Sequence, residues 1–333
     1  MSKSDLEESS GGSETNVITK PTIWQRFKSH MKKWWSAYLI GFICIFLVVF
    51  LPIIYVGIPH WADSYVDSYE YDETGLAITN PRPTAFHISQ SKKISMGGGF
   101  SGSGHLSAFN ASIRTSNDQE FAIFPVPEIK FGNGAYLNID QDLDLSCVDC
   151  VSQLAVSAAT NKSFSVLVKG KPNLKVGGLP TAHLNIHKTM KMNGFVNSNG
   201  AFNITTLDPL SNNTEYNFNA TISLRNPTPF TVEMGHVTFN LSMGGSALGN
   251  VDLPNLKLEQ DISSAVVLIK VNESMLIDEA LLGDGSLGVV TIDIKGHSCD
   301  YNGQDIPYFA AAIQAVSASA TVDLLKYASS LFD

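Results

Sequence analysis

Hydrophobic positions divide this chain into two regions of different pattern. Residues 37–58 form an unbroken apolar run, AYLIGFICIFLVVFLPIIYVGI, and beyond it apolar and polar residues alternate in many segments. In the segment 217–225, NFNATISLR, every second position is apolar: Phe218, Ala220, Ile222 and Leu224. A period of two is typical of a half-buried β-strand, and an apolar run as long as 37–58 is typical of a membrane helix. The pattern therefore predicts one long apolar helix followed by a strand-rich region.

The strand-rich region contains further segments of the same period. The alternation shifts by one residue at Gly235–His236, and such a slip at a glycine indicates a β-bulge. Two helices are predicted, over 147–158 and over 305–315, the second with Pro307 in its first turn. We expect antiparallel sheets rather than alternating strands and helices. Four more alternating runs are predicted as strands: 182–187, 249–258, 266–271 and 289–295.

One motif occurs twice. Residues 226–245 read NPTPFTVEMGHVTFNLSMGG, and residues 80–99 begin with NPRPTAFHIS and end with ISMGGG. In both copies the prolines set an extended entry to an apolar strand, and the Gly-Gly pair turns the chain back. The repetition predicts a mainly β fold with two stacked antiparallel β-sandwich units and a few short helices. We place the first unit at 60–160 and the second, with C-terminal helices, at 161–333.

The apolar run 37–58 is long enough to cross a bilayer. As a helix it would extend roughly 33 Å at about 1.5 Å per residue, against a hydrocarbon core of about 30 Å. The run contains no charged residue, whereas a buried core helix, the alternative interpretation, rarely reaches this length without one. Basic residues precede the run and acidic residues follow it, which predicts an uncleaved signal-anchor with the N-terminus in the cytosol. The bulk of the chain would then lie outside the cytosol.

Two segments precede the predicted span. Residues 1–22 are polar and are expected to form a disordered cytosolic tail. Residues 23–36, IWQRFKSHMKKWWS, predict a basic amphipathic juxtamembrane helix. We expect its cations to contact anionic lipid headgroups; the alternative interpretation is a simple topology signal. These headgroup contacts are Arg26, Lys28, Lys32 and Lys33.

Acceptor sites for N-linked glycans agree with an exported region, because every Asn-x-Ser/Thr sequence follows the predicted span. They predict a glycoprotein with candidate sites at Asn110, Asn161, Asn203, Asn212, Asn219, Asn240 and Asn272.

Charge and cysteine usage narrow the function classes. With 22 Lys and Arg against 31 Asp and Glu, the chain has no basic field of the kind that binds nucleic acid. Cys147 and Cys150 have the spacing of a redox pair or of half a zinc site. In an exported domain a disulfide is the simpler interpretation, either between these two or from one of them to Cys299, with free thiols as the alternative. Cys44 is interpreted as a small apolar residue within the span.

No group of residues predicts catalysis, a cofactor or a metal. His183 and His187 have the spacing of helical zinc ligands, but on one strand they would lie roughly 13 Å apart, too far to share a zinc ion. His87, His105 and His236 stand singly, without a paired Ser or Asp.

Two further segments are interpreted as a turn and as a solvated acidic edge, with adventitious calcium binding as the alternative for the second. The Gly-rich residues 97–104 lack the Lys-Ser/Thr ending of a phosphate loop, and the acidic residues 138–150 lack the Gly and terminal Glu of a helix–loop–helix calcium site. We therefore expect a non-enzymatic protein. A hydrolase would require a convergent nucleophile, base and oxyanion site, and the sequence does not indicate one.

Several longer segments resemble a known family. They are TISLRNPTPFTVEMGHVTFNLSMGGSALGNVDLPNLKL at 221–258, YVGIPHWADSYVD just after the span, KGKPNLKVGG at 169–178 and YNGQDIPYFAAAI at 301–313. The chain resembles a fungal family of single-pass membrane proteins of unknown function, whose repeats are similar to type-2 late-embryogenesis-abundant (water-stress) domains. The resemblance implies exported immunoglobulin-like sandwiches without catalytic residues. A distantly similar yeast protein lies in the vacuolar membrane and acts in termination of autophagy, so we expect the vacuolar membrane, with endoplasmic reticulum or cell surface as alternatives.

Two functions fit these expectations. In the first, the lumenal sandwich repeats form an interaction or scaffold module for another membrane protein or complex. In the second, the sandwich binds or handles lipid beside the bilayer. A core that is closed at both ends would favour the scaffold, and an apolar groove continuous from Ile58 would favour lipid.

Overall fold

The computed structural model describes residues 43–44, 75–94, 103–131, 135–178, 181–195, 202–210, 215–282 and 288–323. The chain divides into two units, residues 1–56 and 57–333. In the first unit only Ile43 and Cys44 are described, and both are helical and exposed. Among the described residues, no helix has the length and apolar character needed to cross a membrane.

Several predictions fall outside the described residues. They are the tail 1–22, the basic helix 23–36 with Arg26, Lys28, Lys32 and Lys33, the span 37–58 apart from Ile43 and Cys44, and the glycan site Asn212.

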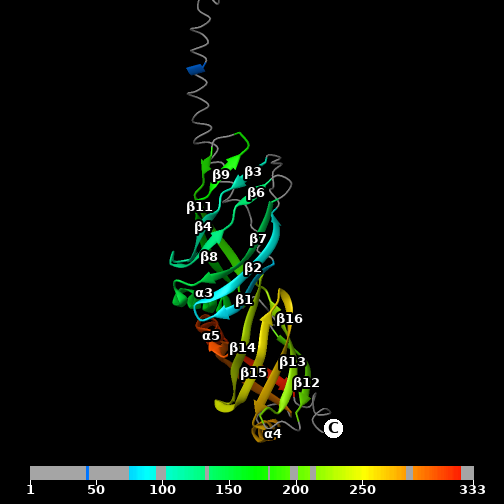
Figure 1. The fold of residues 1–333 in the computed structure, drawn as a ribbon. Helices are drawn as coiled ribbons and strands as arrows, with labels where there is room; N and C mark the ends of the chain where they lie inside the picture. The colour runs from blue at the N-terminus through cyan, green and yellow to red at the C-terminus, as the bar shows by residue number, and fades with distance from the viewer. Residues whose placement is uncertain are drawn as a thin grey trace, which may run out of the picture. The chain divides into compact units, whose positions relative to one another are not determined.

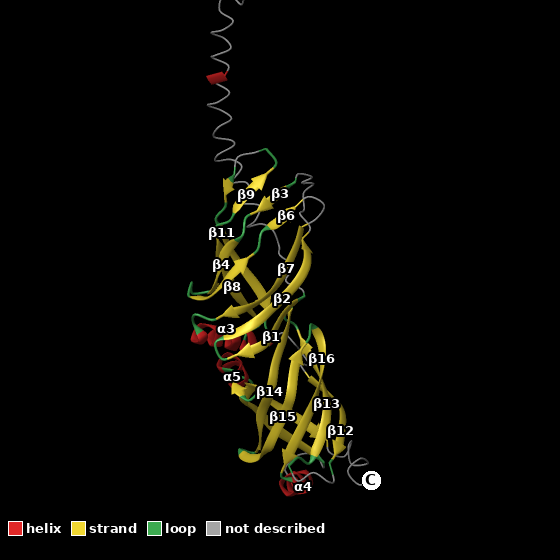
Figure 2. Ribbon diagram, viewed as in Figure 1, coloured by secondary structure: helices red, strands yellow, loops and turns green. Residues whose placement is uncertain are grey.

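Strands dominate the described part of the second unit, as the alternating pattern predicted (Figures 1 and 2). Three short helices accompany them: α3 (Val148–Thr160), α4 (Glu273–Leu282) and α5 (Pro307–Gln314). The structure confirms the helices predicted over 147–158 and 305–315. Helix α4 was not predicted, although Asn272 precedes it as a favoured N-cap residue and accepts a hydrogen bond from the Met275 backbone N–H at 3.4 Å.

Among the described residues, the largest sheet has eleven strands. Its main path runs through β12 (Phe202–Pro209), β13 (Phe218–Asn226), β16 (Asp261–Val271), β15 (Ser246–Leu258), β14 (Phe230–Met243), β1 (Leu76–Arg82), β2 (Ala85–Ile94) and β7 (Ala135–Asp144). The remaining three strands, of which β17 pairs with β14 and with the other two, are β17 (Val289–Tyr301), β18 (Gln304–Asp305) and β19 (Ser317–Asp323). Strands β1 and β14 pair in parallel, with Leu76 opposite Phe230, and so join the N-terminal and C-terminal strands in one sheet.

Two four-stranded sheets complete the described strands. One consists of β10 (Ala182–His183), β9 (Asn173–Val176), β3 (Gly104–Leu106) and β6 (Ile129–Phe131). The other consists of β11 (Ile186–Asn193), β8 (Ser163–Gly170), β4 (Phe109–Thr115) and β5 (Glu120–Val126). Residues 163–193 therefore pair with strands from before residue 131, across the unit boundary that the sequence analysis placed between residues 160 and 161.

Local backbone predictions can be compared directly with the strands. At Gly235 the register of β14 shifts and φ is +86°, so the predicted bulge is confirmed. Gly244 and Gly245, at +57° and +82°, turn β14 into β15, again as predicted. The strand predicted over 182–187 is wrong, because it breaks between β10 and β11. Leu184 lies at the break, buried, and its N–H donates to the Pro172 carbonyl instead of to a neighbouring strand.

The two copies of the Asn-Pro-x-Pro motif have different surroundings. In the first copy β1 and β2 pair with each other as a hairpin. In the second copy β13 pairs with β12 and β16, whereas β14 pairs with β15, β17 and β1. The copies therefore share a strand–turn–strand order and differ in pairing.

Helix α5 joins two apolar cores. Its Tyr308 belongs to a cluster with Phe86, Phe121 and Val151, and its Ile313 belongs to a second cluster around the strands β13–β17. Helices α3 and α5 pack against each other, as Figure 1 shows. Pro307 at the first turn of α5 fits because a proline there gives up no helical hydrogen bond.

Candidate ligand-binding cavity

A cavity of about 940 Å³ lies between these elements. Its wall is formed by α3, by α5 and by strands of the eleven-stranded sheet and of the sheet containing β8 and β11. Protein interiors have few voids larger than one water molecule, whereas ligand pockets measure roughly 300–1,000 Å³. The cavity thus has the size of a ligand site rather than that of a packing defect.

Two walls show how the sequence builds this cavity. On α3 the lining residues Val151, Leu154, Ala155 and Ala158 recur at helical spacing. The alanine side chains are small, so they leave space between the helix and the strands. On β13 the lining residues Ala220, Ile222 and Leu224 alternate with outward-facing polar residues. Ile222 and Leu224 are only half-buried, so this inward face lines open space instead of meeting a packed layer.

Aromatic and sulfur-containing side chains form a further part of the wall. The Phe164 ring on β8 contacts the Phe230 ring on β14 edge to face, with 6.3 Å between centroids. Met190 and Met192 of β11 line the cavity near these strands. Methionine is flexible and polarisable, so it adapts to apolar ligands of different shape.

The polar groups of the wall are few and are mostly satisfied by the protein. The Tyr308 hydroxyl donates to the carbonyls of Arg82 and Ala85, both at 3.1 Å, and burial raises the pKa of this hydroxyl. The Thr160 hydroxyl donates to the Val156 carbonyl at 2.8 Å. The Thr228 hydroxyl donates to Asn226 Oδ1 at 2.6 Å. The wall therefore offers an apolar ligand little competition from unsatisfied polar groups.

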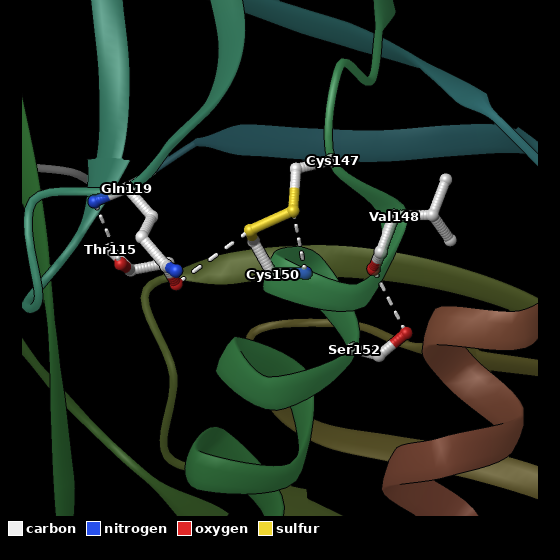
Figure 3. Close-up of a disulfide and its surroundings, with 6 residues drawn as sticks. All are labelled: Thr115, Gln119, Cys147, Val148, Cys150 and Ser152. Carbon is white, nitrogen blue, oxygen red and sulfur yellow. Dashed lines mark hydrogen bonds between the residues drawn. A yellow bond between two sulfur atoms is a disulfide. The ribbon is translucent and has the colours of Figure 1, made fainter.

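The cysteine pair caps the helix that forms one wall. Cys147 and Cys150 form a disulfide, and the Cys150 backbone N–H donates to Cys147 Sγ at 3.2 Å, which satisfies an N-terminal N–H of α3 (Figure 3). Ser152 Oγ donates to the Val148 carbonyl at 3.0 Å in the same turn. The neighbouring Val151 lines the cavity, so the disulfide holds the start of the cavity wall.

Cys299, the third candidate for a disulfide, is a free thiol. It is fully buried on β17, and its Sγ donates to the Met234 carbonyl at 3.4 Å. Burial raises the pKa of this thiol to about 12, which keeps it protonated and unreactive.

The candidate glycan sites mostly lie at the surface. Asn110, Asn161, Asn203, Asn240 and Asn272 are exposed. Asn219, expected on an outer face of β13, is half-buried, and its Oδ1 is buried without a hydrogen-bond partner among the described residues. Five sites therefore have the accessibility that a glycan requires, and Asn219 has less of it.

Two of the three histidines that stand singly in the sequence, His87 and His236, are paired with carboxylates in the fold. His87 on β2 lies between Asp142 and Asp140 of β7, with its Nδ1 and Nε2 each 2.9 Å from a carboxylate oxygen. The hydrogen bond to Asp142 raises the pKa of His87, with Asp140 adding to the effect. His236 Nδ1 similarly lies 2.8 Å from Asp300 Oδ2. The alternating acidic residues of β7 were a visible signal, but their register against β2 was not.

The histidines considered as zinc ligands lie on different strands. His183 is on β10, where its Nδ1 lies 2.6 Å from Asn173 Oδ1, and His187 is on β11. Within the described ranges, no three or more His, Cys, Asp or Glu residues are arranged to hold a metal ion.

Comparison with known proteins identifies a domain without an assigned role. The profile of a family described as "Protein of unknown function (DUF3712)" matches residues 119–241. The match agrees with the expected uncharacterised family, whereas the water-stress repeats and the yeast vacuolar relative stay predictions. Comparison with curated proteins gives no match.

Three solved structures show low similarity. The periplasmic chaperone SfaE is 11% identical, with a TM-score of 0.16, and the match covers 74% of this chain and 94% of that one. The BSP domain of a biofilm-associated protein is 10% identical, with a TM-score of 0.16, over 79% and 54% of the two chains. The CupB6 tip adhesin from Pseudomonas aeruginosa is 8% identical, with a TM-score of 0.14, over 69% and 88%. We draw no conclusion about fold or function from these three.

Proposed function

We propose that this chain is a non-enzymatic protein that binds an elongated apolar ligand, such as the acyl chain of a lipid, in the cavity between its two cores. The observation that supports this proposal is a ligand-sized space with an almost entirely apolar wall. Of the two functions that the sequence left open, lipid binding is the one that accounts for such a space. Scaffolding stays a prediction, since it requires no cavity.

The size of the ligand follows from a balance of free energies. Burying one methylene contributes about 0.8 kcal/mol, so a chain of about fifteen methylenes gains on the order of 12 kcal/mol. Association costs on the order of 4–15 kcal/mol in lost translation and rotation. A chain half as long would gain only about half as much against the same cost of association. Affinity should therefore rise steeply with the length of the apolar chain.

The proposal includes the membrane attachment that the sequence predicts. A single-pass anchor at 37–58, with the N-terminus in the cytosol, would hold the binding unit beside the bilayer that supplies its ligand. Release of the full chain by carbonate washing, together with insensitivity to endoglycosidase, would contradict the anchor and the lumenal location.

Ligand binding is tested by blocking the cavity. Ile222 lines it from β13, so Ile222→Trp extends a larger side chain into the space. Ser223, next to it on the same strand, does not line the cavity, and Ser223→Trp is the matched control. Purified full chain, held in an amphipathic polymer, is titrated with radiolabelled hexadecanol. We expect saturable binding by the wild type and by Ser223→Trp, and at least a tenfold loss in Ile222→Trp. Equal binding by all three proteins, or no saturable binding by the wild type, would refute the proposal.

A further inference from the structure

Three basic side chains lie side by side across the four-stranded sheet of β10, β9, β3 and β6. His105 of β3 lies directly opposite Lys130 of β6 on one side and directly opposite Lys175 of β9 on the other. Side chains in such positions share one face of a sheet, with Cβ atoms about 4.5–5.5 Å apart. Both lysines are exposed, and His105 is half-buried. Together they form a basic row on the solvent side of this sheet.

The other face of this sheet is apolar and is covered by the protein. Leu106, which follows the histidine on β3, and Leu174, which precedes the lysine on β9, pack against the buried residues Ala182 and Leu184. Because successive side chains of a strand alternate between the two faces, the basic row points away from this apolar cluster. The fold therefore fixes the basic face as the one that meets solvent.

Among the residues that the structure describes, no carboxylate forms an ion pair with any side chain of the basic row. Other histidines at paired strand positions face an acid: His87 on β2 lies opposite Asp142. Likewise, His236 on β14 lies opposite Asp300. Like charges that face each other across two strands destabilise a sheet. The basic row would therefore be stabilised by an anionic surface from outside the chain.

We propose that the basic row is a docking surface for the anionic headgroups of a lipid bilayer. Basic side chains near an anionic leaflet are attracted by its surface potential, which requires no shaped pocket. The run 37–58 is predicted to lie in that bilayer, and the chain from Ile58 to Leu76 can extend to at most about 60 Å, so the sheet stays close to the membrane. The inference rests on the membrane attachment included in the proposed function, and it does not depend on a ligand in the cavity.

The size of the effect follows from the range of the surface potential. This potential decays within one Debye length, about 8 Å at physiological ionic strength, so only a face that approaches the headgroups gains from it. Each lysine in that range should strengthen membrane binding by roughly fivefold. Removal of both lysines should therefore weaken binding to an anionic bilayer by at least about tenfold, and should leave binding to an uncharged bilayer unchanged.

The test is co-flotation of the purified full chain, held in an uncharged amphipathic polymer, with vesicles of phosphatidylcholine alone or mixed with phosphatidylserine. The wild type is compared with the double variant Lys130→Gln/Lys175→Gln. The matched control is Lys191→Gln/Lys270→Gln, which removes the same charge from two exposed lysines that each lie opposite an uncharged residue. The predicted headgroup contacts of residues 23–36 are the same in all three proteins and therefore cancel in the comparison. Binding of radiolabelled hexadecanol is measured in parallel.

We expect the wild type and the control to bind the anionic vesicles at least about tenfold more tightly than the double variant, and all three to bind the uncharged vesicles equally weakly. Equal binding of the three proteins to anionic vesicles, or equal weakening in the control, would overturn the docking surface. Self-association of the wild type that is lost in the double variant would also overturn it, because the row would then bind a second copy of the chain.

The parallel measurement separates this inference from the ligand proposed for the cavity. Neither lysine lines the cavity, so all three proteins should bind hexadecanol equally, which also shows that the variants are folded. If the wild type does not bind hexadecanol, the proposed ligand is refuted, and the docking surface is still decided by the vesicle comparison. If hexadecanol binds and the vesicle comparison shows no difference, the docking surface alone is refuted.

Discussion

The hydroxyl group of Tyr308 provides the sharpest test of how α5 holds the fold together. This side chain is 1% exposed, and its hydroxyl donates to the carbonyls of Arg82 and Ala85 in the turn between β1 and β2. Tyr308→Phe removes the donor and keeps the ring, so the ring contacts with Phe86 and Phe309 remain. The perturbation is confined to two carbonyl groups that lose a partner, that of Ala85, which is buried, and that of Arg82, which is partly buried.

The expected loss follows from the cost of unsatisfied buried groups. Leaving a buried acceptor without a donor costs about 1–3 kcal/mol. For a unit of this size, each kcal/mol lowers the midpoint of thermal unfolding by about 2–4 °C. Tyr308→Phe should therefore lower the free energy of unfolding by about 1–3 kcal/mol and the midpoint by several degrees. Both are measured by urea and thermal unfolding of the full chain, followed by the circular dichroism of the strands.

Tyr301 is the matched control. Its hydroxyl donates to Glu233 Oε1 at 3.1 Å, but the residue is half-buried, so water can replace the tyrosine when the hydroxyl is removed. Tyr301→Phe should cost no more than about 0.5–1 kcal/mol. If Tyr308→Phe is as stable as the wild type, or if the two variants lose the same stability, the hydroxyl of Tyr308 does not join α5 to the β1–β2 turn in the way proposed.

Three further predictions concern single contacts. Gly296→Ala should lower the free energy of unfolding in urea by at least about 2 kcal/mol, because the added Cβ would lie 1.8 Å from a carbonyl oxygen of α5. In the control Gly178→Ala the added Cβ meets open space, so stability should not change. Equal effects of the two variants would contradict the packing of Gly296 against α5. Replacing Cys147 and Cys150 by Ser should cost about 2 kcal/mol, as expected for closing so short a loop, and a reducing agent should then have no further effect on the unfolding midpoint. The pKa of His87 is raised above 6.5 in the folded chain, so its contribution to folding stability is complete below that pH and is lost as pH rises through the folded pKa. His87→Asn should therefore lower the thermal midpoint more at pH about 5.5 than at about 8.5. An effect that does not depend on pH would contradict this assignment.

Local pattern was sufficient to predict many elements of this fold. The bulge at Gly235, the Gly244–Gly245 turn and the helices α3 and α5 depend on the chemistry of adjacent residues, and the sequence displays that chemistry directly. The break at Leu184 was missed for the opposite reason. Its apolar side chain fits an alternating strand, and only the hydrogen bond from its N–H to the Pro172 carbonyl shows that pairing stops there.

The cavity could not be predicted from pattern at all. Ile222 and Leu224 were correctly assigned to an inward face. The same alternating sequence pattern is expected whether such an apolar face packs against another layer or lines an empty space. The two cases differ in the distance between α3 and β13, which depends on long-range pairing. His87 illustrates the same limit, since its partner Asp142 lies 55 residues away and is found only through the register of β2 against β7.

The central claim, that an acyl chain occupies this cavity, is tested most directly by photochemical labelling. A hexadecyl ligand with a diazirine at the end of its chain is bound to the full chain and irradiated, and the labelled residues are located by peptide mass spectrometry. The account predicts insertion into the lining segments 151–158 of α3 and 220–224 of β13, suppressed by excess unlabelled hexadecanol and by Ile222→Trp. Labels confined to surface positions outside these segments, or insensitive to competition, would contradict it.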